Sequence, residues 1–514
     1  MTHLSDESTH VRIAIIGSGF AGAGTAIRLL QRSIRDLVIL ERAAELGGTW
    51  RDNSYPGCAC DVSSHLYSLS FALNPEWSRT FSPQGEIWEY LKRIAKEQGV
   101  LPHVRYQHEV LGAEWDREAQ RWQIETTQGG YSASMLVGAA GPFSDPAVPA
   151  LPGLASFEGT TFHSARWDHN YDLTGKRVAV IGTGASAIQF VPQIQPKVAA
   201  LHLFQRTAPW ILPRKDRAID EWERRLYRSS PTLQRLMRGW QYVGREMLFF
   251  PFRHLGVARL VEHMALRHLD ATITDPALRS KLVPNYRIGC KRILVSDDYL
   301  PSLTRPNVEV VTTGITEIRP QAIRSGDGVE RPMDAIILAT GFRPTDPPLA
   351  PHVRGRDGRS LAECWAGSPT AYMGMTMSTF PNLFFLLGPN TGLGHTSVLI
   401  MIEAQIEHLM RAIDLMERRG ASTVEPRVEA QAAYVADIDR RMQGTVWTAG
   451  GCRSWYLDAT GRNSSLWPDG TWSYRRRAAR LDEGDYITEA APIVRLTPAS
   501  ARDPRVTLPP PFRT

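Results

Sequence analysis

Residues 12–41 read RIAIIGSGFAGAGTAIRLLQRSIRDLVILE, and their pattern is the strongest indication of the fold class. Its apolar, β-branched start at 12–16 predicts a strand that runs directly into the glycine turn GSGFAG at 17–22. Apolar residues then recur at helical spacing, and 37–40 predicts a second strand. Glycines at such a turn let the backbone bend sharply and approach a pyrophosphate, which rests on the positive N-terminus of the helix. The stretch therefore predicts the first part of a dinucleotide-binding module.

Glu41 follows the second of these strands directly. A carboxylate at this point accepts hydrogen bonds from a free ribose 2′-hydroxyl, which favours FAD. A lone glycine motif is a weak signal, but here it stands in the full order of strand, turn, helix, strand and acid. We therefore predict an FAD site with contacts from Gly17, Gly19, Phe20, Gly22 and Glu41.

The same order of strand, glycine turn, helix and strand recurs at 177–206. An apolar strand at 177–181 precedes the turn GTGASA, a helix follows, and a second strand at 200–204 leads to Arg206. The interval from Gly182 to Arg206 equals that from Gly17 to Glu41. The second module therefore has a basic residue at the position where the first module has an acidic one. A base there favours a 2′-phosphate and hence NADPH, although a surface arginine at a strand end is the plainer alternative. The expected contacts are Gly182, Thr183, Gly184, Ser186, Ala187, Arg206 and Thr207.

Two further apolar strands, at 135–140 and 335–339, each run into a glycine turn suited to passing the chain between nested domains. The predicted fold class is α/β, with two Rossmann-like domains and the NADPH domain inserted into the FAD domain. We expect the FAD domain at 1–145 and 341–490 and the NADPH domain at 146–340. A helical excursion is expected at about 219–270 and an extended, proline-rich tail at 491–514.

Charge gives no indication of a nucleic-acid partner. The chain has 59 basic and 53 acidic residues, for a net charge of +6, and the two signs are interspersed. The densest basic run, Arg475-Arg476-Arg477, is interpreted as a solvated helix face or loop. The mild positive balance instead suits a pocket for anionic nucleotides.

The five cysteines are odd in number and irregularly spaced, which indicates a reducing compartment and argues against a disulfide framework. Cys58 and Cys60 have no partner at zinc-ligand spacing, so no metal site is expected. The polar N-terminus is not typical of a signal peptide, and no apolar run is long enough to span a membrane. The sequence therefore predicts a cytoplasmic protein without stable membrane insertion.

Residues 157–168, FEGTTFHSARWD, resemble the fingerprint F-x-G-x-x-x-H-x-x-x-W-[PD] of type I Baeyer–Villiger monooxygenases without a mismatch. They stand between the two glycine motifs, as in that family. A second family pattern, G-G-x-W-x-x-x-x-Y-P-G-x-x-x-D, fits residues 47–61, and Lys291-Arg292 resembles the family's Lys-Arg pair. The resemblance covers about residues 10–400 and assigns the chain to the class B flavoprotein monooxygenases.

The resemblance implies further cofactor contacts. Those with FAD would come from Gly48, Thr49, Trp50, Asp61, Tyr67 and Val110. Lys291, together with Arg206 and Thr207, would hold the 2′-phosphate of NADPH. His163 would transmit domain motion rather than take part in the chemistry. Taken alone, these residues would be ordinary core or surface side chains.

The resemblance also implies an activity. The enzyme would insert one oxygen atom of O₂ next to a ketone carbonyl, through a C4a-peroxyflavin, to give an ester or lactone. Arg292 would keep the peroxide anionic and stabilise the carbonyl oxygen in the transition state, and Asp61 would orient Arg292. Oxygenation at sulfur stays open as a second activity. The alternatives are an N- or S-oxygenating flavin monooxygenase, a flavoprotein disulfide reductase and a non-catalytic nucleotide sensor; the first is disfavoured by Trp167-Asp168 and Arg292.

One family motif is altered near the C-terminus. Ser454-Trp455-Tyr456 is present, but the residues that follow depart from the pattern in which the tryptophan contacts NADP, so Trp455 is only a candidate contact. The loop GPNTGLGH at 388–395 precedes an apolar helix that could aim its N-terminus at the flavin. The apolar segment 247–255 either packs internally or joins that loop in an entrance for lipophilic ketones.

Overall fold

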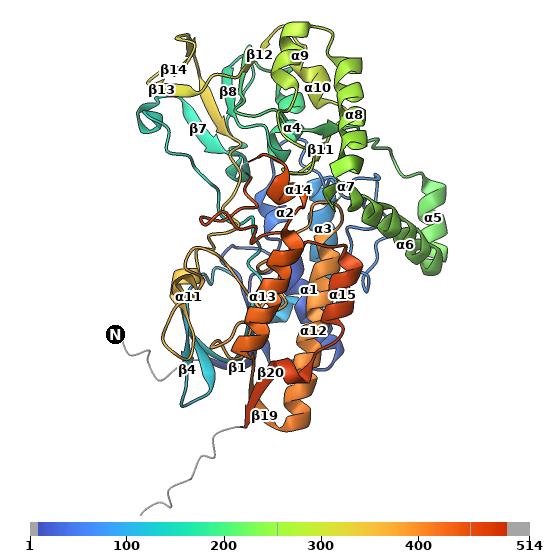
Figure 1. Ribbon diagram of the computed structural model, residues 1–514, viewed down its shortest axis with the longest axis vertical. Helices are drawn as coiled ribbons and strands as arrows, with labels where there is room; N and C mark the ends of the chain where they lie inside the picture. The colour runs from blue at the N-terminus through green and yellow to red at the C-terminus, as the bar shows by residue number, and fades with distance from the viewer. Residues whose placement is uncertain (1–8, 254, 453, 491–514) are drawn as a thin grey trace, which may run out of the picture.

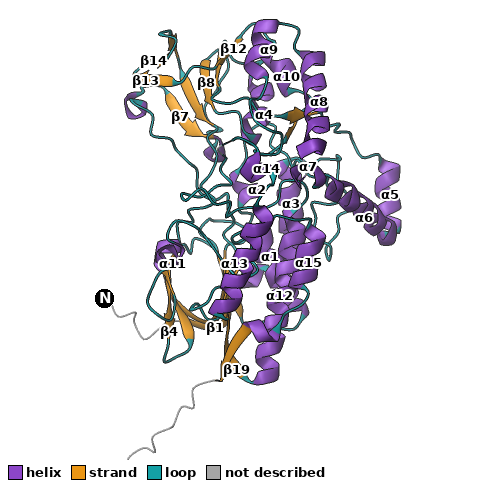
Figure 2. Cartoon of the chain, viewed as in Figure 1, coloured by secondary structure: helices purple, strands orange, loops and turns teal. Residues whose placement is uncertain are grey.

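The structure is a computed structural model of the chain, and it describes residues 9–253, 255–452 and 454–490. Two sheets lie at opposite ends of the molecule, with connecting loops and helices between them (Figures 1 and 2). The sequence predicted both modules, and the fold class is confirmed. The proposed tail at 491–514 lies outside the described residues.

The first sheet contains the first glycine module. Strand β1 (Thr9–Ile16) lies in its middle and pairs in parallel with β2 (Leu37–Leu40) on one side and β6 (Gly129–Gly138) on the other. The sheet continues through β3 (Val104–Arg105) at one edge and, at the other, through β5 (Arg121–Thr126), β4 (Val110–Asp116) and β17 (Val353–Arg354), while β18 (Leu383–Phe385) pairs with the end of β6. Residues after 340 therefore complete a sheet that the N-terminal segment begins.

The second sheet is wholly parallel. Its order is β12 (Val308–Val311), β9 (Ala200–Phe204), β8 (Arg177–Ile181), β16 (Ala335–Leu338) and β7 (Thr160–His163). The chain goes from β8 to β9 on one side, while β16 and β7 lie on the other. The order in which the chain adds strands therefore reverses beside β8, and open α/β sheets bind their ligands at such a point.

Each sheet has its own apolar core. The first is covered by α1 (Phe20–Gln31), α3 (Gln84–Glu97) and α12 (Val398–Arg419), and α15 (Thr471–Ala478) packs on α12. The second is covered by α4 (Ala185–Ile194) and α10 (Tyr299–Leu303). Trp50 packs against both cores, so it lies at the junction of the two sheets.

Two connections between the sheets run side by side. The first follows β6 and the second follows β16, and each contains a glycine in the left-handed region, Gly141 at φ 73° and Gly341 at φ 82°. Ala147 N donates to Gly341 O at 2.8 Å, and Thr340 Oγ1 donates to Ala147 O at 2.6 Å. The paired connections form a two-stranded link between the sheets.

The expected helical excursion is present. It comprises α5 (Glu221–Ser229), α6 (Pro231–Met247), α7 (Phe250–Arg253) and α8 (Leu255–Thr272). Helices α5 and α6 lead away from the rest of the ribbon at the right of Figure 1. Within the described ranges, no helix combines the length and apolar character that crossing a bilayer requires.

Candidate active site

The first glycine turn is closed by contacts that exclude side chains. Gly17 has φ 98°, and a Cβ on Gly22 would lie 1.9 Å from Gly17 O. The backbones of Gly19 and Gly48 face each other, since a Cβ on Gly48 would lie 3.2 Å from the Gly19 Cα. Gly19 is the N-cap of α1 and, in the described structure, no side chain caps this helix. Its N-terminal amides are therefore available to an anionic group.

Glu41 is buried beside this turn. One carboxylate oxygen, Oε2, accepts from Ser18 N at 3.0 Å and Ser18 Oγ at 2.6 Å. The other, Oε1, accepts from Ala43 N at 2.9 Å and Arg51 Nη1 at 3.1 Å. Burial acts to lower the pKa of Arg51, but Glu41 and Asp52 raise it above its ordinary value. The sequence identified Glu41 but not Ser18 and Arg51, which fix the carboxylate.

Aromatic side chains predicted to contact the flavin lie together. Trp50 Nε1 donates to Tyr67 Oη at 2.9 Å, and the ring of Phe20 lies 5.6 Å from that of Tyr67. Burial raises the pKa of Tyr67 well above its ordinary value, so this hydroxyl stays protonated. Thr49 begins the short helix α2 (Thr49–Asp52), and Val110 begins β4 as part of a neighbouring apolar cluster.

The second glycine turn has the same conformation at its first glycine as the first turn, but more space lies around its second glycine. Gly182 has φ 110°, and a Cβ there would lie 2.4 Å from Ala339 O, so only glycine fits. A Cβ on Gly184 would meet no atom within 4 Å. Thr183 Oγ1 donates to Thr207 O at 3.2 Å, which ties the turn to the end of β9. Ser186 and Ala187 lie in the first turn of α4, with Ala187 fully buried.

Arg206 and Lys291 bring two positive charges to the end of β9. Arg206 is exposed, and Lys291 Nζ lies 4.9 Å from the centroid of the Tyr286 ring. Burial lowers the pKa of Lys291, and the charge of Arg206 lowers it further. An anion bound between these two cations would relieve their repulsion and form charge-assisted hydrogen bonds with both. The 2′-phosphate of NADPH would be such an anion.

Arg292 and Asp61 form an ion pair across the two modules. Nε and Nη2 of Arg292 donate to Asp61 Oδ2 at 2.9 and 2.6 Å. Asp61 raises the pKa of Arg292 far above its ordinary value, and burial opposes this only in part. Burial acts to raise the pKa of Asp61, but the charge and hydrogen bonds of Arg292 outweigh it and hold that pKa below its ordinary value. The pair is therefore charged throughout the neutral range.

Three residues that the sequence did not indicate surround this pair. Arg245 of α6 donates to Asp61 O at 3.3 Å, and Arg214 donates to Cys60 O at 3.1 Å. Tyr456 is fully buried near Arg292, and burial raises the pKa of Tyr456 to about 12. The spacing of polar residues along α6 is the one sequence signal that could have indicated Arg245.

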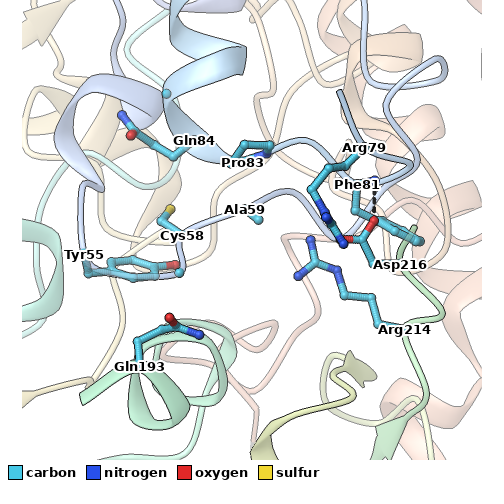
Figure 3. A pocket seen from close by; sticks show the side chains of 12 residues that line it. Tyr55, Cys58, Ala59, Arg79, Phe81, Pro83, Gln84, Gln193, Arg214 and Asp216 are labelled. Atoms are coloured by element: carbon cyan, nitrogen blue, oxygen red, sulfur yellow. Dashed lines mark hydrogen bonds and ion pairs between the residues drawn. The ribbon is translucent and has the colours of Figure 1, made fainter. Parts of the chain in front are cut away.

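A cavity of about 350 Å³ opens beside the loop that carries Asp61. Tyr55 and Gln193 lie at one end, and Arg79, Arg214 and Asp216 at the other (Figure 3). Arg79 donates to Asp216 at 2.7 Å. The volume suits a small organic molecule or part of a dinucleotide.

The loop 388–395 is anchored by the segment in which the C-terminal motif departs from the family pattern. Asn390 Nδ2 donates to Asn463 O at 2.7 Å and to Leu466 O at 3.1 Å. His395 Nε2 lies 3.3 Å from Glu246 Oε1 of α6, and its ring is 5.6 Å from that of Phe249. Segment 247–255 therefore contacts this loop through Phe249, while Met247 and Leu248 are exposed.

Two other predicted residues lie near the links between the sheets. The ring of His163, at the end of β7, is 6.0 Å from that of Phe342. Burial lowers the pKa of His163 to about 4, so it is neutral at pH 7. Trp455 is partly exposed and packs on Phe143, which lies 5.8 Å away, and on Tyr456.

The expectation from the cysteines is wrong for one pair. Cys290 and Cys452 form a disulfide, whereas Cys58, Cys60 and Cys364 are free. The two partners are 162 residues apart, and folding joins their loops, with Arg287 N donating to Gly450 O at 3.1 Å. Odd number and irregular spacing could not exclude this pairing, because neither reports contacts between distant segments. Among the described residues, no group of acidic, histidine and cysteine side chains is arranged to hold a metal ion.

Known proteins resemble this chain over most of its length. The flavin-binding monooxygenase-like family model matches residues 10–354. A Baeyer–Villiger monooxygenase of Streptomyces coelicolor is 52% identical over 93% of this chain and 92% of its own length. One of Pseudomonas aeruginosa is 49% identical over 95% of this chain and 93% of its own.

Solved structures resemble this chain in fold. Cyclohexanone monooxygenase from Rhodococcus sp. Phi1 bound to NADP⁺ superposes with a TM-score of 0.84 at 27% identity, covering 94% of this chain and all of that one. An oxidised steroid monooxygenase bound to NADP gives a TM-score of 0.83 at 30% identity with the same coverage. The chain belongs to the flavin-binding monooxygenase-like family and, within it, to the Baeyer–Villiger monooxygenases.

Proposed function

We propose that this enzyme uses FAD, NADPH and O₂ to convert a ketone into an ester or lactone. One oxygen atom of O₂ enters the bond next to the carbonyl; the other leaves as water, as NADPH and a proton become NADP⁺. The ion pair of Arg292 and Asp61, which joins the two nucleotide modules, carries this proposal. Bound flavin and NADPH supply the electrons that activate O₂.

The first module fits FAD. Gly17 and Gly22 allow a turn so tight that no side chain fits, and the uncapped start of α1 offers amides to a pyrophosphate. The buried carboxylate of Glu41 suits a ribose hydroxyl, since the Ser18 hydroxyl can rotate away. We assign residues 1–145 and 341–490 to this domain, and Phe20, Trp50 and Tyr67 to the flavin site.

The second module fits NADPH. The open space above Gly184 leaves room for a pyrophosphate, and Arg206 and Lys291 present paired cations where the first module has an acid. We assign residues 146–340 to this domain. Trp455 lies beside Tyr456 and hence near Arg292, which supports a contact with the nicotinamide half.

Arg292 would act on the ketone oxygen. Its guanidinium group is held by Asp61 through Nε and Nη2, so its orientation is fixed before substrate binds. A fixed cation stabilises the negative charge that develops on the carbonyl oxygen during attack, without reorganisation of solvent. The same positive charge favours an anionic oxidant, which attacks carbonyl carbons, over a protonated one, which attacks sulfur and nitrogen.

The substrate would be a lipophilic ketone. Phe249 packs beside His395 at the end of the loop 388–395, and we assign this apolar contact to the path by which the ketone would enter. Each methylene moved from water into such apolar surroundings gains about 0.8 kcal/mol, or about 4-fold in kcat/KM. The proposal of a cytoplasmic location rests on the need for NADPH, because the disulfide between Cys290 and Cys452 removes the argument from the cysteines.

The test is a panel of linear, cyclic and aryl ketones plus a thioether, assayed for NADPH consumption, O₂ uptake and product mass. We expect ester or lactone in proportion to NADPH for at least one ketone class, and a chain-length dependence that Phe249→Ala flattens. Sulfoxide without ester would instead identify an enzyme that oxygenates sulfur.

A further inference from the structure

Helix α6 turns its polar side toward the protein. Gln234, Arg238 and Arg245 recur at helical spacing on one face, and each donates to a backbone carbonyl of the first module. Gln234 donates to Asn74 O at 2.6 Å, Arg238 to Leu66 O at 2.8 Å and Arg245 to Asp61 O at 3.3 Å. Gln234 is only 2% exposed.

The opposite side of α6 is apolar and faces solvent. Leu236, Trp240 and Val243 recur at spacings of three and four and are 64%, 76% and 55% exposed. A Cβ built on Gly239 or Gly244 would meet no atom within 4 Å, so no other described segment covers this side of the helix. A surface helix of a globular protein has the reverse arrangement, with its apolar stripe on the core.

Helix α5 extends the exposed surface. Its Trp222 is 64% exposed, and Leu226 is exposed one turn later. We call residues 221–248, which comprise α5, α6 and the C-cap of α6, the docking arm. This arm lies at the outer edge of the molecule (Figure 1). Single exposed apolar residues are ordinary, but a gathering of this kind marks an interaction surface.

The charge of the docking arm indicates the kind of surface that it binds. The arm contains six arginines and three glutamates, and four of the arginines remain outside once Arg238 and Arg245, which bond inward, are set apart. Glu223 is buried, Glu246 bonds inward to Thr471, and Glu221 is shared by arginines of α5. Two copies of so basic a surface would repel each other, whereas anionic lipid headgroups complement it, and the cytoplasmic leaflet of a cell membrane has such a surface.

We propose that the docking arm binds the surface of an anionic lipid bilayer, with the apolar stripe of α6 against the acyl chains. Exposed tryptophans suit the boundary between headgroups and hydrocarbon. Arg225 and Arg235, both exposed beside the apolar side chains, would reach lipid phosphates. The polar contacts of Gln234, Arg238 and Arg245 keep the protein attached to the other side of the helix.

Vesicle sedimentation of the full-length, FAD-loaded protein tests this. We expect it to bind vesicles of phosphatidylcholine containing about one third phosphatidylglycerol, and to bind pure phosphatidylcholine several-fold more weakly. The double variant Leu236→Ser/Trp240→Ser should lower the partition coefficient about 10-fold or more. The matched control Val329→Ser/Val428→Ser removes comparably exposed apolar side chains elsewhere and should bind like the wild type.

A second variant separates charge from apolar contact. Arg225→Gln/Arg235→Gln leaves the stripe intact and should abolish the preference for phosphatidylglycerol. Both docking variants change exposed side chains, so their melting temperatures and NADPH oxidation without vesicles should match the wild type. The proposal is overturned if the wild type does not bind, if either docking variant binds as the wild type does, or if light scattering finds a dimer that Leu236→Ser/Trp240→Ser converts to monomer.

Discussion

Arg292 donates from both Nε and Nη2 to a single oxygen, Oδ2, of Asp61. The two residues are 231 positions apart and come from different nucleotide modules. Folding of the inserted module onto the first is therefore what creates the pair. Its geometry fixes the guanidinium plane on one side, and the backbone of Asp61 is itself held by Arg245.

The charge at Arg206 should decide cofactor choice. Arg206→Ala removes a charge-assisted contact of about 1.5–3 kcal/mol, so KM for NADPH should rise about 10- to 100-fold while NADH use barely changes. Steady-state rates with both cofactors measure this. Arg305→Ala, another exposed arginine of the same domain, is the control. Equal damage to both cofactors would argue against the 2′-phosphate assignment.

Arg245 should matter to catalysis, although we assign it no contact with substrate. Arg245→Met removes the donor to the Asp61 carbonyl, so Arg292 should lose its fixed orientation and ester formation should fall about 10-fold, with KM for NADPH nearly unchanged. Arg245→Lys should restore part of the rate. Arg235→Met, on the same helix but exposed, should have no effect on either parameter. A rate loss from Arg235→Met would mean that the helix as a whole, rather than this contact, is responsible.

The disulfide should be detectable by counting thiols. The unfolded, unreduced protein should expose three free thiols, those of Cys58, Cys60 and Cys364, and reduction should add two more. Cys452→Ser should lower the free energy of unfolding by about 2–5 kcal/mol, because the bond closes a long loop. Cys364→Ser, a free cysteine, serves as the control. Five reactive thiols before reduction would contradict the pairing.

The stability of the folded protein should depend on pH between about 4 and 6.5. Burial lowers the pKa of His408 from 6.5 to about 4, and its ring nitrogens lie 2.9 Å from Ala478 O and 2.7 Å from Tyr486 Oη. The folded state keeps this ring neutral while the unfolded chain takes up a proton below pH 6.5. The free energy of unfolding should therefore decrease from pH 6.5 to about 4, by up to about 1.4 kcal/mol per pH unit for this group.

Denaturant titrations across this range measure the effect. His65 and His163 have the same lowered pKa of about 4 and act in the same window. His408→Gln should make the dependence shallower without abolishing it. A variant with the slope of the wild type would show that His408 is already charged in the folded state.

Local sequence was sufficient for the two nucleotide modules. Gly17, Glu41, Gly182 and Arg206 stand just after strands that the local pattern predicts, and the strands at 177–181 and 200–204 have the predicted ends. Glycine turns of this kind depend on backbone conformation, which the local sequence dictates. The pairing of Lys291-Arg292 with distant residues came from family resemblance, since no local rule places Arg292 beside Asp61.

The remaining features depend on contacts between distant segments. Periodicity predicted helices at 219–270, but it did not indicate that Leu236 and Trp240 face solvent. An apolar stripe specifies a helix face without specifying what covers it. Cys290 and Cys452 likewise meet only because the loop after α9 (Pro276–Leu282) folds onto the loop after α14 (Val446–Ala449).

Product analysis under isotopically labelled O₂, with wild-type enzyme and Arg292→Ala, tests whether the enzyme inserts oxygen into a ketone and whether Arg292 is required. We expect the wild type to form an ester or lactone containing one labelled oxygen atom for each NADPH consumed. Arg292→Ala should bind FAD and consume some NADPH, yet release labelled hydrogen peroxide and return the ketone unchanged. Substantial labelled ester from Arg292→Ala would contradict the role assigned to this residue, and unlabelled product from the wild type would contradict the reaction itself.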